Sequence, residues 1–267
     1  LYSGLDLSRI MAKRSGKSVA QFLGSDLKEI PVYSVIGYDN GNDEAGLEEE
    51  IDYALSRGIK SFKIVVGAKS AERDAHRIKT LRNRVGENAL IGVDAFRTFG
   101  DLETAKHRVN LFKEYGISFV EDAFLESQSK LSIALREQTG VPVSFGESLA
   151  SASMAQQVID YHQVDVLRID ALVIGGVSEF IKAADYADRS GIQYSTHIHT
   201  EVHSQIAAAT KNCYAGGIEY LDPEYEIDLF HHLLLRPIEI SDGKAQLSTE
   251  PGFGIEWDWK AIQCNSA

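Results

Sequence analysis

The stretch SFVEDAFLESQSKLSIALREQTGVPVSFGES, residues 118–148, holds the repeating unit from which most of the chain can be built. Two short apolar runs, 118–124 and 141–148, flank an amphipathic segment, 130–140. Runs of this kind predict two buried strands with a helix between them. The order strand, helix, strand is typical of a parallel sheet covered by helices. Each expected strand carries an acidic residue at or near its end, Glu121 and Glu147.

This unit recurs along the chain. The expected strands occupy eight apolar runs, at residues 30–38, 61–67, 89–96, 118–124, 141–148, 164–170, 192–198 and 217–222. The expected helices occupy the seven segments between them, at 44–58, 71–86, 101–116, 130–140, 153–162, 177–191 and 201–212. This pattern predicts an α/β fold of the (β/α)7β barrel type. An open doubly wound sheet remains an alternative, because periodicity alone cannot close a barrel.

The two ends of the chain fall outside this rhythm. Residues 1–28 predict a helix and a linker into the barrel, as though an earlier part of the protein precedes them, and the barrel itself is expected at 29–235. Residues 236–267 contain a turn at SDGK and a Pro-Gly-x-Gly segment. They predict a C-terminal extension that leaves the barrel.

Composition excludes several classes of partner. The 267 residues include 39 acidic and 27 basic side chains, for a formal net charge of −12. Such a surface repels nucleic acid and anionic membrane, so neither is an expected partner. No apolar run approaches the roughly 18 residues that a membrane helix needs, and the start lacks the features of a signal peptide. The two cysteines, Cys213 and Cys264, form no disulfide framework, which favours a cytoplasmic protein.

Acidic residues stand at equivalent ends of three consecutive expected strands. These residues are Asp94, Glu121 and Glu147. In a barrel they would converge on one spot, and three carboxylates that close need a cation between them to stay ionised. Oxygen ligands without cysteine or histidine favour Mg²⁺. The alternative is that each acid caps a helix or pairs with a surface lysine.

The later strands carry a possible acid–base pair. Asp170 and His197 end adjacent strands, and an aspartate bound to one imidazole nitrogen raises the basicity of the other. The alternative is a histidine hydrogen-bonded only for stability. Lys63 in SFKIVVG faces inward, so it requires an anionic partner. Glu219 lies on the eighth strand.

Eight segments, in this order, resemble the enolase superfamily and within it the mandelate racemase subgroup. They are GIKSFKIVVG, IGVDAF, SFVED, SFGES, LRIDALVIGG, YSTHIH, GIEYLD and EPGFGIEWDW. The resemblance runs from about residue 5 to residue 260. It implies a modified TIM barrel of the enolase type and a soluble enzyme that binds Mg²⁺. It also implies that this chain lacks most of an N-terminal capping domain, on which the C-terminal extension would pack.

The resemblance assigns a role to each candidate residue. It makes Asp94, Glu121 and Glu147 the Mg²⁺ ligands, and Asp170 with His197 the acid–base dyad. It makes Lys63 the group that neutralises a substrate carboxylate. It makes Glu219 the residue that hydrogen-bonds that carboxylate while itself protonated.

Two residues depart from the family pattern. Val65 stands where a second lysine is often found, and Phe96 where an asparagine often sits beside the metal. A racemase with two bases needs one on each face of its substrate, and valine has no proton to exchange. Some acid-sugar dehydratases of the subgroup, the rhamnonate-type enzymes among them, similarly lack that lysine.

The expected activity is therefore the Mg²⁺-dependent dehydration of a sugar acid, a 2,3-dihydroxy carboxylate, to a 2-keto-3-deoxy acid through an enediolate. The alternatives are a racemase, epimerase or cycloisomerase of the same superfamily, or a non-catalytic descendant that binds an acid. A small-molecule carboxylate substrate and a homo-oligomer are expected.

Three further side chains belong to the expected surroundings of the site. Arg168 shares a face with Asp170, so it is expected either to supply charge missing at Val65 or to form a salt bridge with a barrel acid. His199 is expected to contact a substrate hydroxyl. Its spacing of four from His203 is also that of some zinc sites, although no H-E-x-x-H motif is present.

Overall fold

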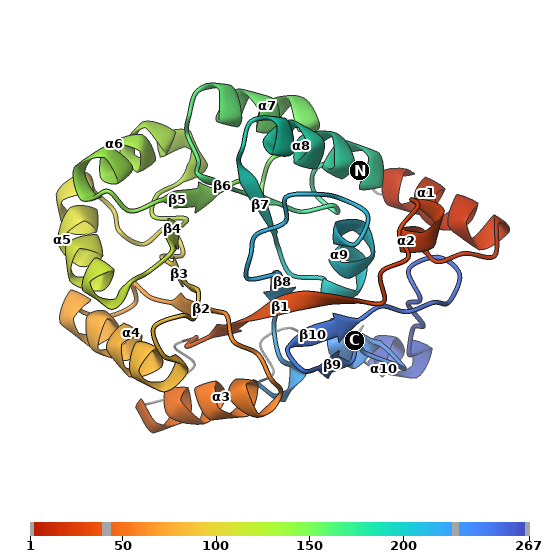
Figure 1. Cartoon of the computed structure of the whole chain (residues 1–267), viewed down its shortest axis with the longest axis horizontal. Coiled ribbons are helices and arrows are strands. Elements are labelled where there is room, and N and C mark those ends of the chain that lie inside the picture. Colours follow the sequence, from red (N-terminus) through yellow and green to blue (C-terminus); the bar gives the residue numbers. More distant parts are fainter. Residues whose placement is uncertain (1–2, 39–43, 226–229, 265–267) are drawn as a thin grey trace.

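The computed structural model describes residues 3–38, 44–225 and 230–264. Eight parallel strands form one sheet that curves into a ring, with helices outside it (Figure 1). The strands are β1 Glu29–Ile36, β2 Phe62–Val65, β3 Ile91–Asp94, β4 Phe119–Glu121, β5 Val143–Phe145, β6 Val166–Ile169, β7 Gln193–Thr196 and β8 Ile218–Tyr220. Seven of them lie within the expected runs and β1 begins one residue before its run, so the α/β prediction is confirmed.

Seven helices follow the strands in turn. They are α3 Glu44–Ser56, α4 Ala71–Val85, α5 Leu102–Phe112, α6 Ser129–Thr139, α7 Ala152–Asp160, α8 Val177–Arg189 and α9 Thr200–Ala207. Short side chains cap several N-termini. Ser70, for example, accepts a hydrogen bond from the Arg73 amide, and Asp101 accepts one from the Thr104 amide. The segment expected as one helix at 101–116 ends early, because a 3₁₀ turn at Lys113–Tyr115 follows α5.

The strands lie side by side in chain order from β1 to β7, and β8 pairs with the other edge of β1. A doubly wound sheet would change direction within this order, so the barrel reading is favoured over the open one. No main-chain ladder joins β7 to β8 among the described residues. Side chains bridge this seam instead: the Glu219 amide donates to Thr196 Oγ1 at 3.1 Å, and Thr200 Oγ1 donates to the Glu219 carbonyl at 3.0 Å.

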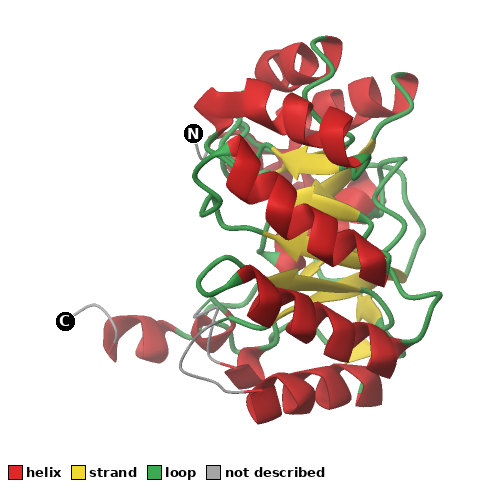
Figure 2. Ribbon diagram, turned by 90° about the vertical axis from the view of Figure 1, so that its left-hand side faces the viewer, coloured by secondary structure: helices red, strands yellow, loops and turns green. Residues whose placement is uncertain are grey.

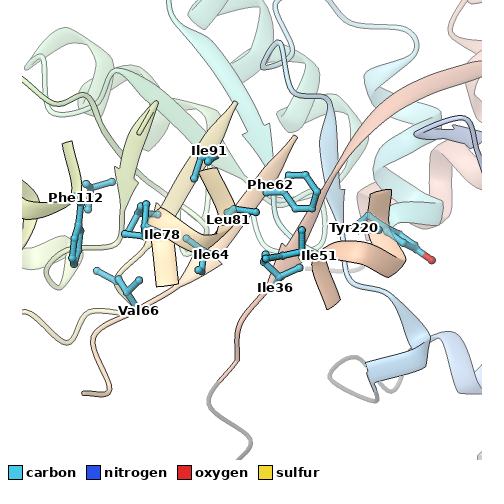
Figure 3. Close-up of a cluster of buried hydrophobic side chains, with 14 of the residues drawn as sticks. Ile36, Ile51, Phe62, Ile64, Val66, Ile78, Leu81, Ile91, Phe112 and Tyr220 are labelled. Carbon is cyan, nitrogen blue, oxygen red and sulfur yellow. The ribbon is translucent and has the colours of Figure 1, made fainter. Parts of the chain in front are cut away.

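The core lies between the strands and the helices around them. On β2, Phe62 and Ile64 are buried, and Ile78 and Leu81 of α4 face them from one side of that helix (Figure 3). Their spacing of three residues puts both on the same helical face. A second cluster packs α7, α8 and α9 against β5, β6 and β7. This packing holds the carboxyl ends of the strands in fixed relative positions.

Both ends of the chain are attached to the barrel. In the expected C-terminal extension, β9 (Ile240–Ser241) and β10 (Lys244–Gln246) form a hairpin, and β10 pairs antiparallel with β1. Ile240 and Ala245 are buried in the same core cluster as the barrel helices. The extension therefore continues the barrel sheet before the last helix, α10 Trp259–Cys264, projects from the body (Figure 2). Residues 265–267 lie outside the described part.

The expected entry segment consists of α1 (Ser3–Arg14) and α2 (Val19–Phe22). The Val19 amide donates to the Gly252 carbonyl at 2.7 Å, so this segment and the C-terminal extension lie side by side. Residues 1 and 2 lie outside the described part. Among the helices that the structure describes, none combines the length and the apolar character needed to span a bilayer.

Candidate active site

A pocket opens at the carboxyl ends of the strands, where the sequence placed the chemistry. Its lining includes predicted site residues from β3, β6 and β8 and from the loops after β5 and β7. The residues that line it are Tyr38, Asp94, Phe96, Arg97, Asp122, Glu147, Arg168, His197, Ile198 and Glu219. Lys63 and Glu121 are not in this lining, because they are almost fully buried beneath it.

His197 and Asp170 form the expected pair. His197 Nδ1 lies 2.8 Å from Asp170 Oδ2, and Asp170 Oδ1 accepts a hydrogen bond from the Leu172 amide at 2.7 Å. Burial opposes the charge of Asp170, yet the hydrogen bond from His197 and the nearby His203 hold its pKa below the ordinary value. An ionised aspartate at Nδ1 leaves the proton-accepting lone pair on Nε2, which faces the pocket side near Glu147 Oε2 at 3.5 Å.

The backbone after β7 sets the direction of this imidazole. Ile198 and His199 have φ values of 38° and 48°, so two successive residues adopt the left-handed conformation. This turn ends β7 and starts α9 at Thr200. Two consecutive non-glycine residues in this region carry strain that packing must offset, and such strain is concentrated at functional sites.

Arg168 lies at the centre of the carboxylates. Its side chain is 4% exposed, and its guanidinium is within 4 Å of four acids. Nη1 lies 3.9 Å from Asp94 Oδ2 and pairs closely with Glu121 Oε1, and Nε lies 3.3 Å from Glu147 Oε2. Nη2 donates to Glu219 Oε1 at 3.2 Å. Arg168 therefore forms salt bridges with barrel acids, which was one of the two expectations for this residue.

Lys63 meets the anionic partners that its inward position requires. Nζ donates to Glu219 Oε2 at 2.5 Å, pairs closely with Glu121 Oε1 and lies 3.5 Å from Asp94 Oδ2. Burial and Arg168 oppose its charge, but Glu219 and its other neighbours raise the Lys63 pKa overall. The structure thus places Lys63 among acids of the protein, and its contact with a substrate stays a prediction.

Glu219 is held by both cations. Burial favours its neutral form, but the charges of Arg168 and Lys63 outweigh burial and lower the Glu219 pKa well below its usual range. Its Oε1 also accepts a hydrogen bond from the Ile198 amide at 2.9 Å. This charge environment favours the ionised form of Glu219, and the protonated form that the resemblance implied, in contact with a substrate, stays a prediction.

Asp122 and Arg97 also line the pocket. Asp122 is not one of the predicted site residues, and Arg97 follows the third expected strand, where the sequence predicts either a substrate contact or a loop cap. Asp122 has a φ of 47°, which turns its side chain toward the pocket lining immediately after Glu121. Burial and the charge of Glu147 raise its pKa to about 7, although Arg97 Nη2 lies 2.9 Å from Asp122 Oδ2. Arg97 also donates to Glu147 Oε1 at 2.7 Å. The adjacent acids in SFVED were the available signal for a second carboxylate here.

The remaining predicted residues lie at different depths around the pocket. His199 is not among the residues that line the pocket, and its ring packs edge-on against Phe230 with centroids 4.9 Å apart. His203 is fully buried: Nδ1 donates to the Ile198 carbonyl at 2.6 Å, and Nε2 accepts from the Ala171 amide at 3.0 Å. Because both nitrogens of His203 are used inside the protein, the zinc alternative for this histidine pair has no support. Phe96 is 62% exposed at the pocket.

The donor set has the right chemistry for Mg²⁺. Oxygens of Asp94, Glu121 and Glu147 surround one positive centre, and Glu121 Oε2 is buried without a hydrogen-bond partner among the described residues. That centre is the guanidinium of Arg168. As the side chains stand, no three acids, histidines or cysteines in the described part are arranged to hold a metal. The oxygen donors of the predicted ligands suit the ion chemically, but the guanidinium of Arg168 lies where these oxygens converge.

Comparison with known proteins identifies relatives whose fold agrees with the one described above. A family model described as enolase C-terminal domain-like matches residues 46–261. The chain is 28% identical to an arabinonate dehydratase of Saccharolobus solfataricus over 94% of this chain and 68% of that protein. It is 26% identical to a chloromuconate cycloisomerase of Pseudomonas sp. strain P51 over 96% of this chain and 70% of that protein.

A solved structure shares the architecture. It is the L-talarate dehydratase of Polaromonas sp. JS666 complexed with Mg and L-glucarate. The TM-score is 0.82 at 27% identity, covering 97% of this chain and 70% of that one. The chain spans 68–70% of these three relatives and less than two thirds of some others.

Proposed function

Because the chain belongs to the enolase C-terminal domain-like family, we propose that it carries the catalytic site of a Mg²⁺-dependent acid-sugar dehydratase. The substrate would be a 2,3-dihydroxy carboxylate and the product a 2-keto-3-deoxy acid. The observation that carries this proposal is the His197–Asp170 pair at the pocket, with valine at position 65 on β2. One imidazole faces the substrate space, and the described lining contains no lysine.

Asp94, Glu121 and Glu147 would hold the metal. When bound, Mg²⁺ would act as a Lewis acid toward the substrate carboxylate and favour loss of the proton at carbon 2. Relatives of this chain include an enzyme crystallised with Mg and a sugar diacid, which supports the pairing of this ion with this substrate class.

His197 would then move the protons. Its Nε2 takes the proton from carbon 2, and the electron pair of that C–H bond forms the enediolate. The same nitrogen, now protonated, gives its proton to the 3-hydroxyl as the C3–O bond breaks, so that water leaves. The enol that remains takes up a proton at carbon 3 and releases the proton of its 2-hydroxyl, which gives the 2-keto-3-deoxy acid. Asp170 keeps Nδ1 protonated throughout and stabilises the imidazolium.

Charges already in the site would stabilise the enediolate. Negative charge grows on the substrate carboxylate as the proton leaves, and preorganised cations stabilise that charge more than the ground state. Lys63 and Arg168 are cations beside the site, and Arg97 is a third that lines the pocket. Glu219, bound to Lys63 and Arg168, would fix their positions and contact the substrate carboxylate once it is protonated.

Racemases and cycloisomerases remain the rival activities, because such enzymes are among the relatives. Val65 weighs against a two-base racemase. A second base is needed on the face opposite His197, and the side chain that would supply it from β2 has no titratable group. The non-catalytic rival is weakened by the formed His197–Asp170 pair.

The test is a screen of acid sugars with the full 267-residue chain and Mg²⁺, with detection of 2-keto-3-deoxy products. Turnover of at least one sugar acid is expected, and His197→Asn should lower it by at least about 10²-fold. His107→Asn, a change at an exposed histidine of α5, should leave it unchanged. Exchange of the carbon-2 hydrogen without loss of water would instead indicate an epimerase. Binding of Mg²⁺ without any turnover would support the acid-binding reading.

The cellular location, the domain bounds and the oligomeric state also belong to the proposal. The free thiols of Cys213 and Cys264 suit a reducing cytoplasm. We also propose that residues 29–235 form the catalytic barrel, that the flanking segments face a capping domain, and that the protein is a homo-oligomer.

A further inference from the structure

Arg168 is an unusual occupant of a site built from acids. The cluster contains four carboxylates, from Asp94, Glu121, Glu147 and Glu219, and Arg168 is within 4 Å of each. Lys63 is a second cation in the cluster. Arg97 lies at its edge, where it is shared between Glu147 and Asp122. Three cations against these four carboxylates and Asp122 leave a net negative charge, which attracts a divalent ion.

Ion pairs hold most of the Arg168 guanidinium. Nη1 pairs closely with Glu121 Oε1 and Nε lies 3.3 Å from Glu147 Oε2, although neither nitrogen makes a hydrogen bond of good geometry in the described part. Its hydrogen bond is the one from Nη2 to Glu219 Oε1. Arg168 also lines the pocket, so the head group has open space beside it. A group held in this way can move without leaving Glu219.

We propose that Arg168 is a built-in competitor of the metal: its guanidinium neutralises the carboxylates in the metal-free protein and must move aside when a divalent cation binds. This inference rests on the proposed metal site at Asp94, Glu121 and Glu147. It explains why three acids that suit Mg²⁺ do not form a metal cage in this structure. It also predicts that the metal-free protein is folded, because the site carries its own counter-charge.

The affinity of the site for metal would therefore depend on competition between the Arg168 guanidinium and the divalent ion for the same carboxylates. Arg168→Gln removes one positive charge and leaves a neutral amide. The four acids would then attract a divalent ion more strongly, because a like charge about 4 Å away no longer repels it. Arg168→Lys keeps the charge on a compact head group.

The experiment is a titration with Mn²⁺, followed by the loss of the EPR signal of the unbound ion, on metal-free full-length protein. Arg168→Gln should bind Mn²⁺ at least about tenfold more tightly than wild type, and Arg168→Lys should stay within about threefold of it. Arg84→Gln, which removes an equally charged group from a surface salt bridge with Glu48 and Asp52, should bind as wild type does. Mg²⁺ should displace Mn²⁺ from all four proteins.

A thermal melt keeps the test decisive if the variant folds poorly. Metal-free Arg168→Gln should melt below wild type, and added Mn²⁺ should raise its melting temperature by more than it raises that of wild type. Equal or weaker Mn²⁺ binding by Arg168→Gln would overturn the inference and leave the proposed metal site standing. Absence of binding to wild type and to all variants would overturn both.

Discussion

At the scale of single residues, Val65 bears most directly on the proton chemistry of the proposed function. It pairs in register with Asp94 of β3, and it is half-buried and packs against the cluster that includes Tyr33 and Val35. Lys63, two residues earlier on the same face, instead forms salt bridges with three acids of the protein. The β2 side of the site therefore has no side chain placed to exchange a proton with carbon 2.

Val65→Lys should create a second base. We expect the variant to exchange the carbon-2 hydrogen of its substrate with solvent deuterium and to form the carbon-2 epimer, because a lysine can approach from the face opposite His197. The measurement is NMR of the substrate in D₂O. Val65→Met, which adds length without a titratable group, is the matched control. If both variants exchange hydrogen equally, the added amine is not the cause.

At the scale of elements, side-chain hydroxyls bridge the seam between β7 and β8, and Thr196 supplies one of them. Thr196 Oγ1 accepts a hydrogen bond from the Glu219 amide at 3.1 Å, and both residues are buried. The neighbouring hydroxyl of Ser195 is also buried but has no hydrogen-bond partner among the described residues. Substitutions at these two adjacent positions therefore distinguish the stability contributed by the hydrogen bond across the seam from that of a buried hydroxyl alone.

Thr196→Val should lower the free energy of unfolding by about 1–3 kcal/mol, because the Glu219 amide would be buried without an acceptor. Ser195→Ala should change it by less than about 0.5 kcal/mol. Urea denaturation of the two variants and wild type provides the measurement. Equal effects of the two changes would mean that the seam is closed by packing alone.

The helix α9 carries a pH-dependent contribution to stability through His203. Burial lowers the His203 pKa, with Asp170 acting in the opposite direction and His199 and His197 acting with burial. Its Nε2 accepts a hydrogen bond from the Ala171 amide, so a proton there would remove that bond. The neutral ring is favoured in the folded state. Its contribution is therefore complete above the unfolded pKa of about 6.5 and is lost as the pH falls below it.

The free energy of unfolding of wild type should fall between pH 7 and pH 5, with a contribution from His203 of up to about 1.4 kcal/mol per pH unit. His203→Gln keeps an acceptor for the Ala171 amide but does not titrate, so its stability should depend less on pH. His107→Gln, at an exposed position, should keep the wild-type slope. Urea denaturation at a series of pH values tests this, and identical slopes for wild type and His203→Gln would refute it.

At the scale of the whole molecule, one side chain fastens both chain ends to the barrel. Gln205 of α9 is 1% exposed. Its Oε1 accepts a hydrogen bond from the Ala20 amide at 2.9 Å, and its Nε2 donates to the Ser248 carbonyl at 2.8 Å. The N-terminal segment, the barrel and the C-terminal extension therefore meet at a single amide.

Gln205→Leu should lower the free energy of unfolding by about 1–3 kcal/mol, because the buried Ala20 amide loses its acceptor. Gln246→Leu is the matched control, because the side-chain amide of Gln246 makes only long hydrogen bonds, of 3.4 and 3.5 Å, within the described part of the chain. Limited proteolysis would add a local readout: the Gln205 variant should be cut faster near both chain ends. Unchanged proteolysis and stability would show that the ends are held by apolar contacts.

The fold could be predicted largely from the sequence, because strand and helix periods are local properties of neighbouring residues. The eight apolar runs and the acids at 94, 121 and 147 were visible as a pattern, and the order of the strands confirms the barrel class. The C-terminal extension was less predictable. Its pairing with β1 is a contact between residues more than 200 positions apart, and short β-like pieces do not reveal their partner.

The sequence by itself determined the alternation of strands and helices, the family, and the set of acids, bases and cations that meet at the strand ends. Only the tertiary structure decided how those charges are shared. It placed Arg168 among the expected metal ligands, buried Lys63 under three acids and turned Asp122 into the pocket. The physical reason is that periodicity specifies which face of a strand a residue occupies. The distance between charges, and therefore which pairs dominate and which pKa values shift, depends on the packing of the whole barrel.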